Sequence, residues 1–179
     1  KAINMQSLAT FAFVLIAIAA MTNLIFRDWR VNSAAMVLQY LAAFILVSLS
    51  WPVSLAIVNL ITGWMSTSAL GLTRLRQKNA AFITESNTSL VFRGLSGLLT
   101  VMLIFILAPI LQQQVFPKVD LLIIQGGLIL SGISLLQLGT NSDPYMTIIS
   151  LLSFLTGFSI IHSALEVSTL LLGLMVVVN

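Results

Sequence analysis

Two titratable side chains near the end of the chain have a spacing that chemistry could use. His162 and Glu166 stand four residues apart, so a continuous helix would place both on one face, where an imidazolium and a carboxylate could interact or relay a proton. An ionisable residue within a membrane span is a candidate for an ion or proton path. The alternative is a chain turn at this point, with both residues at the interface and Glu166 opposing the dipole of the following helix.

The other carboxylates lie beside charges or turns. Asp28 stands between Arg27 and Arg30, and this cluster predicts an interfacial group of ion pairs at the lipid headgroups. Asp120 and Asp143 lie next to predicted span ends and have the same explanation. None of them forms a catalytic pair by spacing.

Several kinds of catalyst are excluded by what the sequence lacks. The chain has one histidine and no cysteine, so it has no disulfide, no thiolate metal site and no Cys nucleophile. It contains no phosphate-binding glycine loop and no plausible Ser-His-Asp arrangement. We therefore predict no catalytic residue, no metal site, no independent enzyme and no cofactor with dedicated ligands, and we leave open a bound lipid, pigment or quinone.

The composition predicts which solvent surrounds the protein. Of 179 residues, 59% are hydrophobic and 7% are charged, and the mean hydropathy is +1.08, whereas a soluble domain carries about a quarter charged residues. The sequence therefore predicts an all-α, polytopic transmembrane helix bundle. The net charge of +3 is modest and its basic residues lie in loops, so we predict no nucleic-acid partner.

Apolar runs and polar breaks predict about seven spans, because a bilayer needs about 20 apolar residues per helix. The run 34–72 is too long for one span and divides at Ser50-Trp51-Pro52. A break between His162 and Glu166 would divide the last run. The predicted spans lie at about 7–26, on either side of the break within 34–72, at 94–111 and 121–138, and twice within 145–179.

Four regions follow from these spans. Residues 1–73 form a first three-helix unit, 74–93 a polar loop that contains Glu85, 94–119 a linker span and loop, and 120–179 a second three-helix unit. The glutamines at 112–114 are expected in the aqueous linker. The last run is still apolar at Asn179, so we expect the natural chain to continue beyond it, and Lys1 need not be its natural start.

The two units align as an internal repeat. A shift of 114 residues places Trp51-Pro52 on Leu165-Glu166 and Phe44 on Phe158 without a gap. The polar breaks then coincide as well as the apolar runs, and this favours two parallel repeats. The alternative is chance similarity between leucine-rich helices.

Small and polar residues inside the predicted spans have a packing explanation. Glycines permit close approach of helix backbones, and neutral polar side chains form hydrogen bonds between helices. A hydrated path is the alternative for the polar group. The packing glycines are Gly126, Gly127, Gly132 and Gly157, and the polar residues are Asn23, Gln39, Asn59 and Gln125.

Positive residues predict the orientation, because they are retained on the cytoplasmic side. With an outside N-terminus, the inside loops contain Arg27, Arg30, Arg74, Arg76, Lys78 and Arg93, and the outside loops contain Lys1 and Lys118. We expect a multi-pass protein of the bacterial inner membrane with its N-terminus outside.

The segment from Gly139 to Ala164 resembles a known group of small subunits. Its turn is followed by Pro144-Tyr145-Met146-Thr147-Ile148-Ile149-Ser150-Leu151-Leu152 and by Leu155-Thr156-Gly157-Phe158. This pattern is similar to the second helix of the K subunit of respiratory complex I, the C subunit of Mrp-type antiporters and membrane component E of group 4 hydrogenases. The resemblance covers about 121–179, and also 7–65 if the repeat is real.

That resemblance implies a membrane subunit among antiporter-like partners. In the K subunit, buried membrane glutamates are tied to proton translocation, and the match places Leu152 where the second-helix glutamate would fall. Glu166 lies fourteen residues later and cannot inherit that role. We therefore expect a non-catalytic subunit of an energy-transducing bacterial complex, in contact with lipids and other membrane subunits, that assists proton or cation translocation at most near His162 and Glu166.

Two alternatives remain open at this point. The first is an accessory subunit of a photosynthetic or respiratory complex that stabilises pigment or quinone proteins. The second is a small transporter built from two parallel repeats, with its substrate held between them near the membrane midplane.

Overall fold

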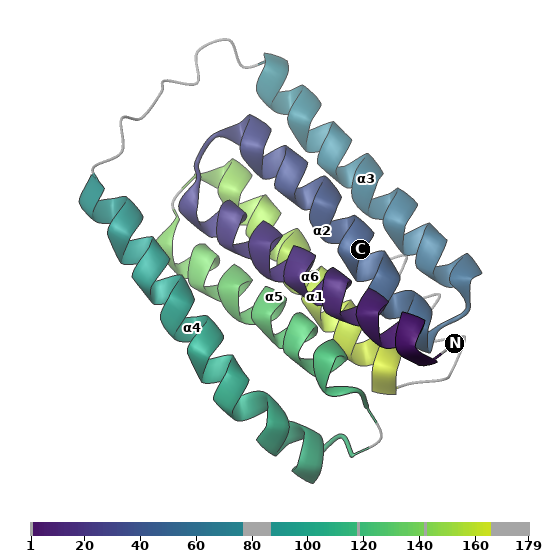
Figure 1. Cartoon of the computed structure of the whole chain (residues 1–179). Coiled ribbons are helices and arrows are strands. Elements are labelled where there is room, and N and C mark those ends of the chain that lie inside the picture. Colours follow the sequence, from purple (N-terminus) through teal and green to yellow (C-terminus); the bar gives the residue numbers. More distant parts are fainter. Residues whose placement is uncertain (1, 77–86, 118, 142, 166–179) are drawn as a thin grey trace.

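The computed structural model describes residues 2–76, 87–117, 119–141 and 143–165. Within these ranges the chain forms no strand and six helices: α1 (Ala2–Ile25), α2 (Trp29–Ser50), α3 (Val53–Arg76), α4 (Asn87–Gln114), α5 (Leu121–Thr140) and α6 (Pro144–Leu165) (Figure 1). All six are long and apolar enough to cross a membrane. The prediction of an all-α, multi-pass membrane protein is confirmed.

Short polar turns decide where the helices begin and end. Asp28 caps α2 by accepting a hydrogen bond from the backbone N–H of Arg30 at 3.0 Å, which satisfies one donor that the first helical turn leaves open. At the other end of α2, Pro52 has no N–H to continue the helix. The predicted division at Ser50-Trp51-Pro52 is therefore confirmed, since α2 ends at Ser50 and α3 begins at Val53.

Four helices form the centre of the bundle and two lie on its flanks. α1 packs on α2 and α5, and α6 packs on α5 and α2. α3 contacts α2 on one flank, while α4 contacts α5 and α1 on the other (Figure 1). Of the most apolar window of each helix, 56% is buried in α5 and 17% in α4, so α5 is central and α4 presents most of its surface to the surroundings.

Glycines set the closest approach between central helices. A Cβ added to Gly157 of α6 would lie 2.8 Å from the carbonyl oxygen of Gly127 in α5 and 2.5 Å from the Ser131 hydroxyl oxygen. No side chain fits there, so the α5 and α6 backbones touch along this line. Backbone contact of this kind maximises van der Waals packing, which helices in lipid need because hydrocarbon offers no hydrophobic drive between them.

The polar segment between α3 and α4 is shorter than the predicted loop 74–93. Helix α3 runs through Arg76 and α4 begins at Asn87, so Arg93 belongs to α4 and is only 4% exposed. The glutamines at 112–114, expected in an aqueous linker, are helical, since α4 includes all three. At 28 residues, α4 is about 42 Å long and exceeds the hydrocarbon core, so its polar ends remain helical in the headgroup region.

The predicted seventh span lies outside the described residues. Helix α6 continues through His162 to Leu165, the last described residue, so the predicted break stays a prediction. Glu166 and the remainder of the predicted second three-helix unit, residues 166–179, fall outside the described ranges. The described chain therefore contains six of the expected spans.

Substituting Gly157 by Ala should test the α5–α6 contact. The methyl group would collide with backbone atoms of Gly127 and Ser131, so we expect the free energy of unfolding to fall by about 1–3 kcal/mol, measured by denaturation with sodium dodecyl sulfate from dodecyl maltoside micelles. The matched control is Gly139→Ala, where a Cβ meets nothing within 4 Å. This control should be neutral or stabilising by up to about 1 kcal/mol, and equal losses in both variants would contradict the packing argument.

Candidate functional site

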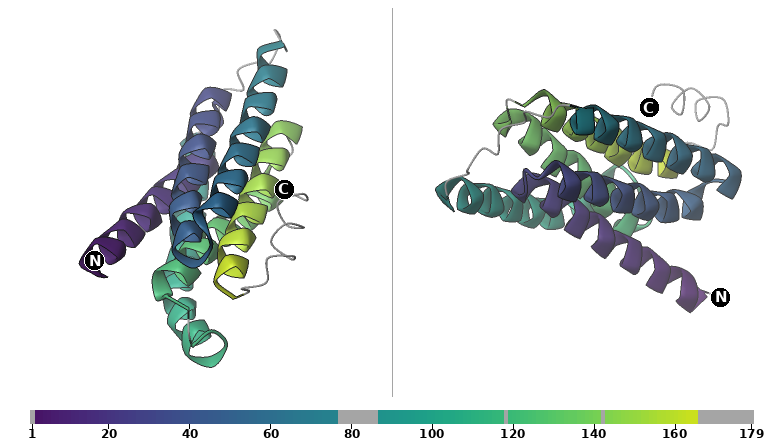
Figure 2. Two further views of the ribbon diagram at one scale, coloured as in Figure 1. Left: turned by 90° about the vertical axis from the view of Figure 1, so that its right-hand side faces the viewer. Right: turned by 90° about the horizontal axis from the view of Figure 1, so that it is seen from above.

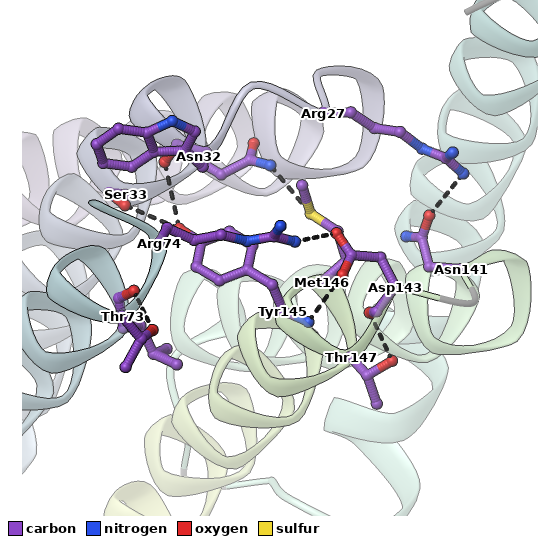
Figure 3. A network of polar contacts seen from close by, with 12 residues as sticks. Arg27, Asn32, Ser33, Thr73, Arg74, Asn141, Asp143, Tyr145, Met146 and Thr147 are labelled. Carbon is purple, nitrogen blue, oxygen red and sulfur yellow. Dashed lines mark hydrogen bonds and ion pairs between the residues drawn. The ribbon is translucent and has the colours of Figure 1, made fainter. Parts of the chain in front are cut away.

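A polar network joins three helices at the end of the bundle where α2 and α6 begin (Figure 3). Arg74 of α3 forms an ion pair with Asp143, and its guanidinium lies 4.7 Å from the ring centroid of Tyr145. The Tyr145 hydroxyl bonds to the Ser33 hydroxyl at 2.9 Å and donates to the Trp29 carbonyl at 3.2 Å. The network thus ties the end of α3 to the starts of α2 and α6.

Two further contacts join the turns at the same end. Arg27, between α1 and α2, donates from Nη2 to the side-chain oxygen of Asn141 at 2.9 Å. One helical turn further, Asn32 places its amide nitrogen 3.1 Å from the sulfur of Met146. Figure 3 shows that both contacts run from the α1–α2 hairpin to the α5–α6 hairpin.

A buried seam of neutral polar side chains continues into the middle of the bundle. Gln39 donates to the Ser153 hydroxyl at 3.1 Å, and its side-chain oxygen accepts from Asn23 at 3.3 Å. All three residues are buried: Gln39 is 0% exposed, Ser153 3% and Asn23 2%. Amides and hydroxyls do not titrate near neutral pH. The seam can therefore hold helices together or form hydrogen bonds to a ligand, but it cannot take up or release a proton.

Three contacts at or near α2 and α6 share one sequence offset, while Ser33–Tyr145 and Trp29–Tyr145 join residues 112 and 116 positions apart. Arg27–Asn141, Asn32–Met146 and Gln39–Ser153 each join residues that are 114 positions apart. The two helices are therefore parallel and in register from their first turn to their middle. An offset this regular means that each helix presents the same face, at the same height, to the other.

A pocket of about 250 Å³ lies beside the polar network. It is lined by Leu70, Thr73, Arg74, Asp143, Pro144, Tyr145 and Ile148. Its two charged groups are paired with each other, and the Thr73 hydroxyl donates to the Leu70 carbonyl of its own helix at 2.7 Å. The pocket contains no side chain placed as a nucleophile beside a base, which a covalent or acid–base catalyst would require.

The three described aspartates all sit at helix N-termini. Asp28 and Asp120 cap α2 and α5, and Asp143 accepts from the backbone N–H of Tyr145 at 3.2 Å in the first turn of α6. In the predicted interfacial cluster, Arg30 lies over the Trp29 ring at 5.4 Å. Carboxylates placed this way satisfy open N–H groups and oppose the helix dipole, which is a structural role.

Of the candidate proton-path residues, His162 lies at the opposite end of the bundle. His162 occupies the last turn of α6, with its ring 5.9 Å from that of Phe158. Its Nδ1 is buried with no hydrogen-bond partner among the described residues. Glu166 falls outside those residues, so the spacing of the pair stays a prediction.

The predicted packing glycines face neighbouring helices. A Cβ on Gly126 would lie 2.9 Å from Leu46, and one on Gly132 would lie 3.1 Å from Ile104. Gly127 and Gly157 face each other as described above. Among the polar candidates, Asn23 and Gln39 come together in the seam, whereas Asn59 on α3 and Gln125 on α5 are each buried elsewhere.

Several residues of the site were missed from the sequence. Arg74 and Asp143 were assigned to separate polar segments, and nothing in their local sequence indicates that they pair across 69 positions. Ser153, Asn141 and Met146 do carry a signal, since the 114-residue shift aligns each with the residue it contacts. The residue types alone gave no reason to select Ser153 or Met146 as site residues.

Charged groups are distributed unequally between the two ends. Among the described residues, the arginines lie toward the end that carries the polar network: Arg27, Arg30, Arg74, Arg76 and Arg93. The opposite end has Asp120 and His162. Within the described ranges no group of three His, Cys, Asp or Glu residues could hold a metal ion.

Comparison with known proteins adds no assignment. Neither a protein-family model, nor a curated protein, nor a solved structure matches this chain.

The Arg74–Asp143 pair should couple α3 to α6. In a double-mutant cycle with Arg74→Gln and Asp143→Asn, we expect a coupling free energy of about 0.5–1 kcal/mol that declines as salt is raised, because the Asp143 side chain is 40% exposed. Asparagine keeps the helix cap, so the cycle isolates the ion pair. Unfolding in detergent measures it, and a coupling of zero at low salt would contradict a structural role for the pair.

Proposed function

We propose that this chain is a non-catalytic integral membrane subunit of an energy-transducing bacterial assembly, of the complex I, Mrp antiporter or group 4 hydrogenase kind. One observation carries the non-catalytic part: the buried seam around Gln39 is neutral, and all three described carboxylates serve as helix caps. Proton relays in membrane proteins commonly run through ionisable side chains inside the spans, and the described part of the seam has none. The kind of assembly is supported by the resemblance of residues 139–164 alone.

The surroundings of Leu152 agree with a scaffold role. This residue takes the place of the glutamate that the resembling K subunits use, and here it packs against a buried cluster of Met36, Tyr40, Met146 and Ile149. An apolar contact at this position holds α2 to α6 and offers no proton acceptor. The candidates for a contribution to a proton path remain His162, at the other end of the bundle, and Glu166, which lies outside the described residues.

We infer that the α1–α2 and α5–α6 hairpins are two copies of one unit. Two copies related by a twofold axis meet through equivalent residues near that axis, and three hydrogen bonds join residues 114 apart. The far end of the bundle supports the same relation, because a pocket there is lined by residues at the same offset. The pairs are Met5 and Val119, Gln6 and Asp120, Ala9 and Ile123, and Ser50 and Ala164.

The repeat favours a second candidate function, a small transporter. Parallel repeats around a shared axis occur in transporters that hold substrate between the repeats. The tightly bonded seam between α2 and α6 counts against it, since Gln39 and Ser153 already satisfy each other. A transporter would have to break these contacts in every cycle.

Copurification separates the two functions. A tagged chain extracted from bacterial membranes in a mild detergent should retain larger antiporter-like membrane proteins. The same chain purified alone into liposomes should give no proton or cation flux above that of empty liposomes. Flux by the isolated chain would contradict the subunit proposal and favour the transporter.

Replacing Glu166 by Gln tests the proton-path component in the intact assembly. If Glu166 assists translocation, the variant should lower proton pumping, while Glu85→Gln, a control in the predicted polar loop, should leave it unchanged. Unchanged pumping in both variants would dismiss the path and leave the scaffold role.

The arginine-rich end is proposed to face the cytoplasm, with the N-terminus outside a bacterial inner membrane. The chain has no cysteine, so maleimide labelling of a single introduced cysteine shows the accessibility of that position alone. We expect Gln114→Cys, at the end of α4, to react with a membrane-impermeant maleimide added to whole cells. Thr88→Cys, in the first turn of the same helix, should react only after permeabilisation, and the reverse pattern would overturn the orientation.

A further inference from the structure

The end of the bundle opposite the polar network has an open pocket of about 480 Å³ between the starts of α1 and α5 and the ends of α2 and α6. Figure 1 shows these four helix ends together near the N-terminus, and in both views of Figure 2 the start of α1 diverges from the other helices. The volume lies within the range of small-molecule sites. The pocket is formed by both hairpins and belongs to neither alone.

The lining divides into an apolar wall and a polar rim. The apolar wall is formed by Met5, Ala9, Leu49, Val119, Ile123 and Ala164, and the polar rim by Gln6, Ser50 and Asp120. Val119 of the apolar wall is anchored to α4, because Gln112 donates a hydrogen bond to its carbonyl at 2.9 Å. A mixed lining of this kind fits an amphiphile, with its chain on the wall and its head at the rim.

The charge at the rim decides which head would bind. Among the described residues of the lining, Asp120 is the one with a charged side chain, and it uses Oδ1 to accept the Leu122 N–H at 3.3 Å. A carboxylate has capacity for several donors, so it can accept from a ligand while it caps α5. The complementary head is a cation that donates hydrogen bonds, which is a primary ammonium.

A buried indole lies next in sequence to the pocket lining. Trp51 follows Ser50 of the rim and is 7% exposed, and its Nε1 has no hydrogen-bond partner among the described residues. A buried N–H without an acceptor is costly. A phosphate or ester oxygen of a bound phospholipid would provide an acceptor if the headgroup reached Trp51.

We propose that this pocket binds an amine-headed phospholipid, with the ammonium group at Asp120 and an acyl chain along Met5, Ala9 and Ile123. The bound lipid would fill the space between the two hairpins at the end where α1 and α6 separate. This site does not depend on the subunit or transporter role.

Quenching of Trp51 fluorescence tests the site. In a Trp29→Phe, Trp64→Phe background, the full chain is placed in vesicles of phosphatidylcholine with increasing amounts of brominated phosphatidylethanolamine, phosphatidylglycerol or phosphatidylcholine. We expect phosphatidylethanolamine to quench with about fivefold higher apparent affinity than phosphatidylcholine, whose quaternary ammonium cannot donate a hydrogen bond. Equal quenching by the three lipids, or a preference for phosphatidylglycerol, would overturn the proposal.

Three variants assign the effect to the pocket. Asp120→Asn keeps the helix cap and removes the charge, so it should abolish the preference for phosphatidylethanolamine. Asp28→Asn makes the same change at the cap of α2, at the other end, and should leave the preference intact. Ala164→Phe should weaken quenching by all three lipids by filling the pocket. A preference retained in Asp120→Asn, or lost in Asp28→Asn, would contradict the site.

Discussion

Lipid offers no hydrogen bonds, and every other feature of this protein follows from that constraint. Backbone groups must be satisfied inside each segment, so the described chain is helical wherever it is apolar. Polar side chains must find partners in the protein, and Gln39 does so by bonding to Ser153 and Asn23 at once. Ionised groups have no comparable partners in the middle of the bundle, so the described aspartates lie at helix ends.

The same constraint explains how the helices are held together. Lipid is as apolar as leucine, so helices gain little from burying apolar surface against each other and depend on close contact. Gly127 and Gly157 provide that contact between α5 and α6. Tyr40 fills the space above Gly63, whose absent Cβ would lie 2.2 Å from the ring, and this brings α3 against α2. Small residues on one helix therefore determine where large residues on the next one pack.

The sequence was sufficient for the class of fold because length and hydropathy depend on local composition. The division at Ser50-Trp51-Pro52 was predictable because proline acts on its own helix. The extent of α4 was not, since whether Arg93 ends a helix or continues it depends on what surrounds the side chain. The site divides in the same way: Asn23 and Gln39 stand out as amides in apolar runs, whereas the Arg74–Asp143 pair exists only once α3 and α6 are placed side by side.

The in-register contact between α2 and α6 has a consequence for how such a bundle could arise. If the two hairpins were separate identical chains, each position on the axis would face its own copy: one Arg27 guanidinium would oppose another, and like charges at close range repel. In a single chain the two sides are free to differ, and here an arginine meets an asparagine and a glutamine meets a serine. Joining two hairpins in one chain permits an asymmetric interface that a symmetric pair of hairpins could not form.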